Sequence, residues 1–297
     1  MYERMKIELL KEIRDILADT YEVITFLAYK NGKEMDAFSI REEESKASPT
    51  FYFENYFKDY CAGTSIDTLA REIIGMYYHA MSSLDVDVDN LNDFETQKDK
   101  IVYRLVNKEM FKNQLNDIPH IDFFDLAIVF YCMLDINEES VMSYLLTNST
   151  IEMWGIKKEL LFTIATKNTP KVLPVSIFSM IQFMFDDIDN DLTMEEMIEA
   201  LPESPMYIVS NVHKKYGFAS ILYPNLLELV GNKLGNFYIL PSSLHEALIV
   251  PVSAGMGVKE LKEMVRSVNA TEVEPEDLLS NSVYFYDTRT QKIDAYM

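Results

Sequence analysis

The densest group of reactive side chains is Ser242-Ser243-Leu244-His245-Glu246, which places hydroxyl, imidazole and carboxylate groups next to one another. A serine nucleophile needs a base within hydrogen-bonding reach and donors that stabilise an oxyanion. Neighbours this close in a turn usually point apart, and the segment lacks the Gly-x-Ser-x-Gly elbow that exposes a nucleophilic serine. We therefore interpret it as a polar turn after Pro241, with the serine hydroxyls bonding local backbone before a buried strand at 247–250.

The catalytic candidates are Ser243, His245, Glu246, His120 and Asp125. His120 and Asp125 join the set because segments 101–130 and 219–250 show the same order: a strand, a helix, a step ending in proline and an apolar strand. A duplication would bring the two histidine regions together across a cleft, which favours a hydrolase of unfamiliar type. Convergence on a common strand–helix–strand unit explains the likeness nearly as well.

The four histidines, His79, His120, His213 and His245, give little support for a metal site. Helix-borne sites need ligands three or four residues apart, and no histidine pair has that spacing. His120 and Asp122 would share a face only if the chain between them is extended. We place His120 and His213 in surface loops by default, and His79 on an apolar helix as a satisfied or partly exposed packing residue.

Two acidic runs, Asp85-x-Asp87-x-Asp89 and Asp187-x-Asp189-x-Asp191, resemble calcium loops. Both lack the glycine and glutamate that such a loop needs at its sixth and twelfth positions. Gly255-x-Gly257 precedes an expected helix but has no third glycine, and the chain holds nine glycines in all. We therefore expect neither a bound metal nor a nucleotide cofactor.

The chain is strongly acidic: 48 Asp and Glu against 27 Lys and Arg give a formal charge of −21. Phosphate backbones and anionic lipids repel such a surface unless it has a basic patch, and the richest basic spots are pairs such as Lys157-Lys158. We expect no nucleic-acid or membrane partner. The two cysteines, Cys61 and Cys132, and the charged amphipathic N-terminal stretch predict a cytoplasmic protein.

Helical and strand patterns alternate and predict an α+β fold of mostly antiparallel sheets with helices packed on one face. Asn31-Gly32 predicts a hairpin turn. The apolar run 123–134 predicts a buried strand paired with 141–146. Further expected elements are helices at 108–115 and 175–185 and a strand pair at 206–210 and 218–222.

Capping-box patterns at Ser149-x-x-Glu152 and Thr193-x-x-Glu196 predict two helix starts. Pro202 and Pro205 mark the clearest boundary. The resulting division is an N-terminal α+β module at 1–148, a helical connecting segment at 149–202 and a C-terminal α+β module at 203–297. The two modules are related if the chain arose by duplication.

Four segments of the chain are Ile118-Pro-His-Ile-Asp-Phe-Phe-Asp-Leu-Ala-Ile-Val, Trp154-Gly, Leu240-Pro-Ser-Ser-Leu-His-Glu-Ala and Leu279-Ser-Asn-Ser-Val-Tyr-Phe-Tyr-Asp. In this order they resemble an uncharacterised family of bacterial proteins of unknown function, mostly from gut Firmicutes. The resemblance runs from Ile101 to the C-terminus, and a fainter one links the chain to a second uncharacterised bacillus family. It implies a bacterial, intracellular protein and assigns no catalytic residue.

No motif completes a catalytic constellation, so the sequence leaves open whether the protein is an enzyme. The leading hypothesis is a non-enzymatic binding or regulatory protein. Its acidic surface suits a basic protein partner, and a small ligand is the other possibility. The alternative is the hydrolase, using the His245 and Glu246 region.

Overall fold

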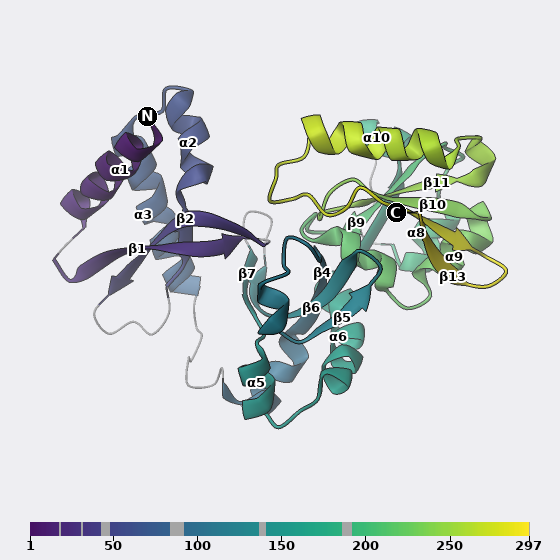
Figure 1. The fold of residues 1–297 in the computed structure, drawn as a ribbon, viewed down its shortest axis with the longest axis horizontal. Coiled ribbons are helices and arrows are strands. Elements are labelled where there is room, and N and C mark those ends of the chain that lie inside the picture. Colours follow the sequence, from purple (N-terminus) through teal and green to yellow (C-terminus); the bar gives the residue numbers. More distant parts are fainter. Residues whose placement is uncertain are drawn as a thin grey trace. The chain divides into compact units, whose positions relative to one another are not determined.

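The computed structural model describes residues 1–17, 19–30, 32–42, 48–83, 92–136, 141–185 and 192–296. Contacts between residues divide the chain into two compact units, Met1–Leu91 and Asn92–Met297, which are described separately below (Figure 1). This division lies between residues 91 and 92, away from the boundaries predicted at 148/149 and 202/203.

In its described residues, unit 1 combines three helices with a three-stranded antiparallel sheet in the order β1-β2-β3. In α1, Met5, Leu9 and Ile13 recur every four residues, so they lie on one face and are fully buried. They pack with buried residues of α3 and β2 into one core. The elements of unit 1 are α1 (Tyr2–Ile16), β1 (Tyr21–Lys30), β2 (Lys33–Glu42), β3 (Thr50–Tyr52), α2 (Phe53–Cys61) and α3 (Ile66–Ser83).

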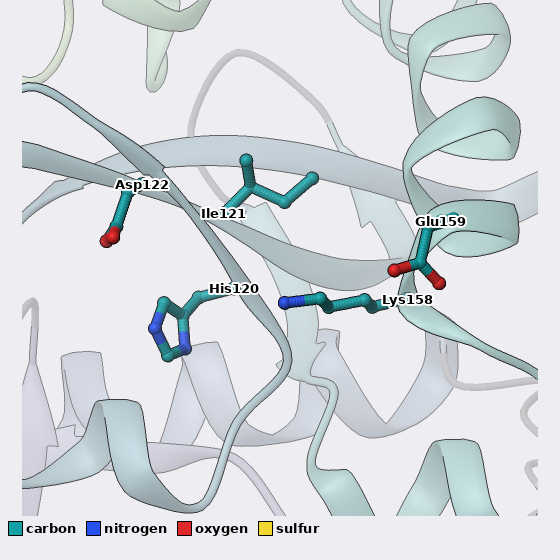
Figure 2. A pocket seen from close by; sticks show the side chains of 5 residues that line it. All are labelled: His120, Ile121, Asp122, Lys158 and Glu159. Atoms are coloured by element: carbon teal, nitrogen blue, oxygen red, sulfur yellow. The ribbon is translucent and has the colours of Figure 1, made fainter.

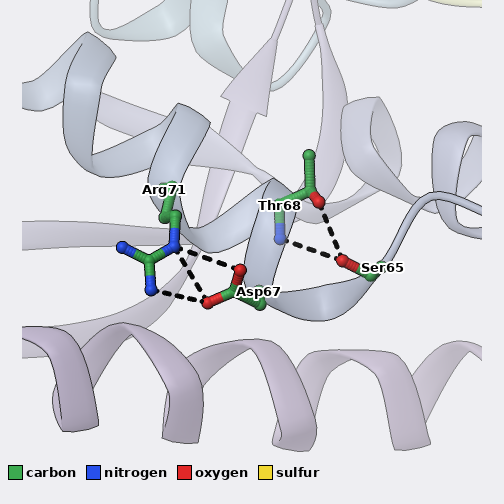
Figure 3. A network of polar contacts seen from close by, with 4 residues as sticks. All are labelled: Ser65, Asp67, Thr68 and Arg71. Carbon is green, nitrogen blue, oxygen red and sulfur yellow. Dashed lines mark hydrogen bonds and ion pairs between the residues drawn. The ribbon is translucent and has the colours of Figure 1, made fainter.

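Local hydrogen bonds fix the start of α3 (Figure 3). The Ser65 hydroxyl accepts from the Thr68 backbone N–H at 3.1 Å, which satisfies a donor that the first helical turn leaves unpaired. One turn on, the Arg71 Nε donates to both carboxylate oxygens of Asp67, at 2.9 and 3.1 Å. The acidic residue stands at the positive end of the helix dipole, where it is favourable.

The described part of unit 2 contains two antiparallel sheets and the remaining elements. Its strands are β4 (Ile101–Asn107), β5 (His120–Phe123), β6 (Leu126–Ile136), β7 (Val141–Leu145), β8 (Val175–Ser179), β9 (Tyr207–Asn211), β10 (Phe237–Pro241), β11 (Ala247–Pro251), β12 (Val283–Asp287) and β13 (Lys292–Tyr296). Its α-helices are α4 (Phe94–Gln97), α5 (Asn148–Met153), α6 (Lys158–Val172), α7 (Met180–Phe185), α8 (Met194–Glu199), α9 (Leu226–Leu234) and α10 (Val258–Thr271). The 3-10 helices are Lys98–Lys100, Gln114–Asn116, Gly217–Leu222 and Val252–Ala254.

The four-stranded sheet is built around the long strand β6. On one edge β6 pairs with β4, and on the other it pairs first with β5 and then with β7 beyond a register shift at Met133/Asp135. The run predicted as a buried strand is thus confirmed, with its expected partner. Opposite residues in antiparallel strands lie on one face, so Arg104, Val129 and His120 form a row across the sheet.

The six-stranded sheet runs β13-β12-β10-β11-β9-β8 and is covered on both faces by helices (Figure 1). Leu240, Val250 and Val283 pack with α10 on one face. On the other face, Ile239 and Tyr284 pack with α9 and with residues of the four-stranded sheet in one shared core. The prediction placed helices on one face only, whereas this sheet has helices on both. The side chains of its strands point alternately to two faces, and both faces are apolar.

The α+β class and the antiparallel sheets are confirmed, while four local predictions are wrong. Residues 218–222 belong to a 3-10 helix, and 108–115 forms turns and the start of a short 3-10 helix. The segment 175–185 begins with strand β8, and α5 is capped by Thr147 and not by Ser149. The capping box at Thr193 and Glu196 is confirmed. Because 219 begins no strand, the similarity between 101–130 and 219–250 does not extend to their structures, and related modules are not confirmed.

Candidate functional site

The turn between β10 and β11 holds Ser242, Ser243, His245 and Glu246, and its hydroxyls bond groups within the turn. The Ser242 hydroxyl donates to the Glu246 carboxylate at 3.1 Å. The Ser243 hydroxyl accepts from the backbone N–H of His245 at 3.0 Å. The geometry agrees with the expected polar turn, followed by strand β11.

Both ring nitrogens of His245 have partners. Nδ1 accepts from the backbone N–H of Tyr216 at 3.2 Å, so in the neutral ring the proton lies on Nε2. Nε2 is 3.4 Å from a carboxylate oxygen of Asp277. A general base needs an acceptor nitrogen directed at its nucleophile. In this arrangement His245 directs neither nitrogen at Ser242 or Ser243.

Asp125 lies in the turn between β5 and β6 and binds hydroxyl groups in strand β12 and in the segment just before it. Its carboxylate accepts from Ser280 at 2.5 Å, Ser282 at 3.0 Å and Tyr284 at 2.7 Å. All three donors are buried. Burial, and then the neighbouring Asp125 charge, raise the pKa of the Tyr284 hydroxyl. The three hydrogen bonds of Asp125 therefore connect the four-stranded sheet to the start of β12.

His120 is the first residue of strand β5, so the prediction that it lies in a loop is wrong. The chain from His120 to Asp122 is extended, which is the condition for these two side chains to lie on the same face. Both residues line a pocket of about 330 Å³ together with Ile121, Lys158 and Glu159 (Figure 2). Lys158 and Glu159 belong to the first turn of α6. The amino end of Lys158 points toward the His120 ring, while Glu159 lies on the helix side (Figure 2).

The charged groups of the pocket differ in how far they are neutralised. The Lys108 ammonium is 2.8 Å from Asp122 and lowers the pKa of that carboxyl group. Among the described residues, no carboxylate lies within 4.0 Å of the Lys158 ammonium. The His120 Nδ1 donates to the Ile118 carbonyl at 3.1 Å, which leaves Nε2 as the acceptor of the neutral ring.

Sequence reasoning missed an aromatic cluster around Arg104. This side chain is 4% exposed, and its guanidinium stacks 3.9 Å from the Tyr131 ring centre and 3.6 Å from that of Tyr216. A terminal nitrogen donates to Ser143 at 2.8 Å, while Nε has no hydrogen-bond partner within the described part of the chain. The sequence signal was a charged residue inside the apolar strand 101–106. Tyr216 also contacts the His245 ring, so the cluster supports the turn that holds His245.

The described hydrogen bonds do not link the predicted site residues into one catalytic group. His245 and Glu246, His120, and Asp125 have different hydrogen-bond partners, and none of these bonds joins one group to another. Within the described ranges, no three His, Cys, Asp or Glu side chains gather as a metal site would require. The acidic runs at 85–89 and 187–191 lie outside the described residues. Of the helices described, none is long and apolar enough to cross a bilayer.

Comparisons with curated proteins and with solved structures gave no match. A model of a family of unknown function, DUF5688, matches residues 2–288. The match includes the segments from which a family of unknown function was expected and extends through unit 1 as well. The chain therefore belongs to the DUF5688 family of unknown function.

Proposed function

We propose that the protein is a binding protein whose unit 2 holds a small ligand bearing both an acidic and a basic group, as an amino acid does. The observation that carries this proposal is the pocket between β5 and α6, in which no carboxylate of the described residues lies within 4.0 Å of the Lys158 ammonium. Its volume of about 330 Å³ is at the lower end of the range for ligand sites.

The two sides of the pocket suit opposite charges. Lys158 offers an ammonium at the first turn of α6, where the helix dipole also favours an anion. Glu159 offers a carboxylate, and the His120 ring, when neutral, offers its Nε2 as a hydrogen-bond acceptor. A carboxylate placed at Lys158 and an ammonium placed at Glu159 would satisfy both ends of one zwitterion.

Two features support binding over hydrolysis. The five lining residues are His120, Ile121, Asp122, Lys158 and Glu159, which include no serine, threonine or cysteine nucleophile. The other histidine considered for catalysis, His245, uses both ring nitrogens in contacts that hold its turn.

Thermal unfolding with added ligands tests the proposal, because a ligand that binds only the folded state raises its stability. The probes are the common amino acids, dicarboxylates and inorganic phosphate. We expect stabilisation by at least one amino acid, its loss in Lys158→Ala and its retention in Lys157→Ala. The adjacent Lys157 does not line the pocket and makes no side-chain capping bond. Equal effects of the two substitutions, or no stabilising amino acid, would refute the proposal.

A further inference from the structure

Strand β1 of unit 1 presents an apolar edge. Among the described residues, this ten-residue strand pairs only with β2, so its other edge has no strand partner. The central residues 24–29 carry no charge. Three large side chains there are exposed: Phe26 by 38%, Leu27 by 60% and Tyr29 by 50%.

Such an edge is a template for pairing with another chain, and proteins usually protect it with charges, proline or a bulge. None of these devices interrupts β1 at its centre: residues 24–29 contain no proline, and the β1–β2 register runs without a shift through all ten residue pairs. An edge this long, regular and apolar is therefore suited to a partner strand.

We propose that the partner is β1 of a second copy of this chain. The two strands would run antiparallel about a twofold axis at Phe26 and join two three-stranded sheets into one. An interface of this kind is self-complementary, because each copy contributes the same residues. This proposal concerns unit 1 and is independent of the ligand pocket in unit 2.

The symmetry restricts the register. A twofold axis that relates antiparallel neighbours in one sheet stands perpendicular to it, so each side chain stays on the same side of the sheet. Opposite residues must then lie on the same face, which along a strand means that both are even-numbered or both odd-numbered. The axis therefore lies midway between the two copies of one residue, which face each other across the interface.

Charge selects among these registers. With the axis at Phe26, Glu22 faces Lys30 of the other copy at both ends of the interface. Between these pairs, Ile24 faces Ala28, and Phe26 faces its own counterpart, an aromatic pair that stabilises sheets. An axis at Thr25 would instead place Glu22 opposite Ala28, and one at Leu27 would place Lys30 opposite Ile24. Only the Phe26 register pairs the charges and keeps the apolar residues together.

The oligomeric state of the full-length protein gives the first test. Sedimentation of the wild type from micromolar to millimolar concentration should show a dimer. Leu27→Lys should shift it to a monomer, because a lysine on an edge strand opposes pairing. Ile7→Lys is the matched control: Ile7 is 68% exposed on α1, so the same change in charge there should leave the dimer intact. A wild-type monomer at every concentration would overturn the proposal, as would equal dissociation by both substitutions.

The second test reads the register, in a Cys61→Ser background that removes the exposed native thiol. With the axis at Phe26, Phe26→Cys places two thiols on directly opposite residues about 4.5–5.5 Å apart between Cα atoms, within disulfide reach. Mild oxidation should therefore link the copies efficiently. Leu27→Cys places the thiols on diagonal neighbours and should link them poorly.

The charge pair gives a third reading. Glu22→Lys should weaken the dimer, and adding Lys30→Glu should restore it. A dimer that fails to cross-link through position 26, or whose affinity the double exchange does not restore, would place the interface elsewhere and reject this register.

Discussion

Asp125 was a catalytic candidate in the sequence, whereas the structure gives it a role in stability that can be measured. Asp125→Ala removes the acceptor of three buried hydroxyl groups, those of Ser280, Ser282 and Tyr284. Each unmade hydrogen bond of a buried group costs about 1–3 kcal/mol. Asp125 is only half-buried, so water can replace part of the loss. At the lower value of about 1 kcal/mol, the three lost bonds sum to about 3 kcal/mol. We therefore expect the free energy of unfolding to decrease by about 3–5 kcal/mol.

Asp122→Ala is the matched control. Asp122 lies three residues earlier in the same hairpin, but its side chain is 70% exposed and its ion pair with Lys108 is screened by solvent. Urea unfolding followed by fluorescence reports on unit 2, because the single tryptophan, Trp154, lies there. The reasoning fails if Asp125→Ala destabilises no more than Asp122→Ala. The destabilisation by Asp125→Asn should lie between those of the two alanine variants, because the hydroxyl groups can rotate to accept hydrogen bonds from the amide.

Three further predictions follow from particular contacts. Gly217→Ala should destabilise by about 2–4 kcal/mol in urea unfolding, because the added Cβ would lie 2.2 Å from the Ser210 hydroxyl oxygen, far inside contact distance. A thiol reagent should label the exposed Cys61 in the native protein, whereas Cys132, buried and with its pKa raised by burial, should react only after unfolding. Lys108→Ala should raise the pKa of Asp122 in an NMR titration. In the wild type, the ion pair stabilises the folded protein at pH values above the pKa that Asp122 has in the unfolded chain. This stabilisation is lost as the pH falls through the lower pKa of Asp122 in the folded protein.

Much of the fold was predictable where the hydrophobic period is long and regular. The helix with Met5, Leu9 and Ile13, the hairpin of β1 and β2, and strands β12 and β13 all follow from local patterns. The segment 217–222 did not, because its apolar run Phe-Ala-Ser-Ile-Leu suits a strand as well as a buried 3-10 helix. Gly217 packs there against Ser210 and the His245 carbonyl, a tertiary contact that no local pattern contains.

The candidate site was less predictable, because sequence shows the types of side chain but not which of their hydrogen-bonding groups folding uses. His245 looked reactive beside two serines, yet its Nδ1 holds the Tyr216 backbone and Tyr216 in turn covers Arg104. His120 stood between apolar residues and drew attention mainly through a repeat that the structure does not confirm. It nevertheless retains an acceptor nitrogen in a pocket, facing a lysine from a helix 38 residues further along the chain.

Ligand binding depends on groups that the fold leaves unsatisfied, and here the two histidines differ in that respect. Moving the His245 ring would cost the Tyr216 bond and disturb the stacking over the buried Arg104 guanidinium, so its replacement should act mainly on stability. Replacing His120 removes one bond, to the Ile118 carbonyl, and a half-buried ring from the pocket wall. His120→Ala should therefore weaken ligand binding more than it lowers stability. The reverse result in paired binding and urea measurements would move the functional site to the His245 turn.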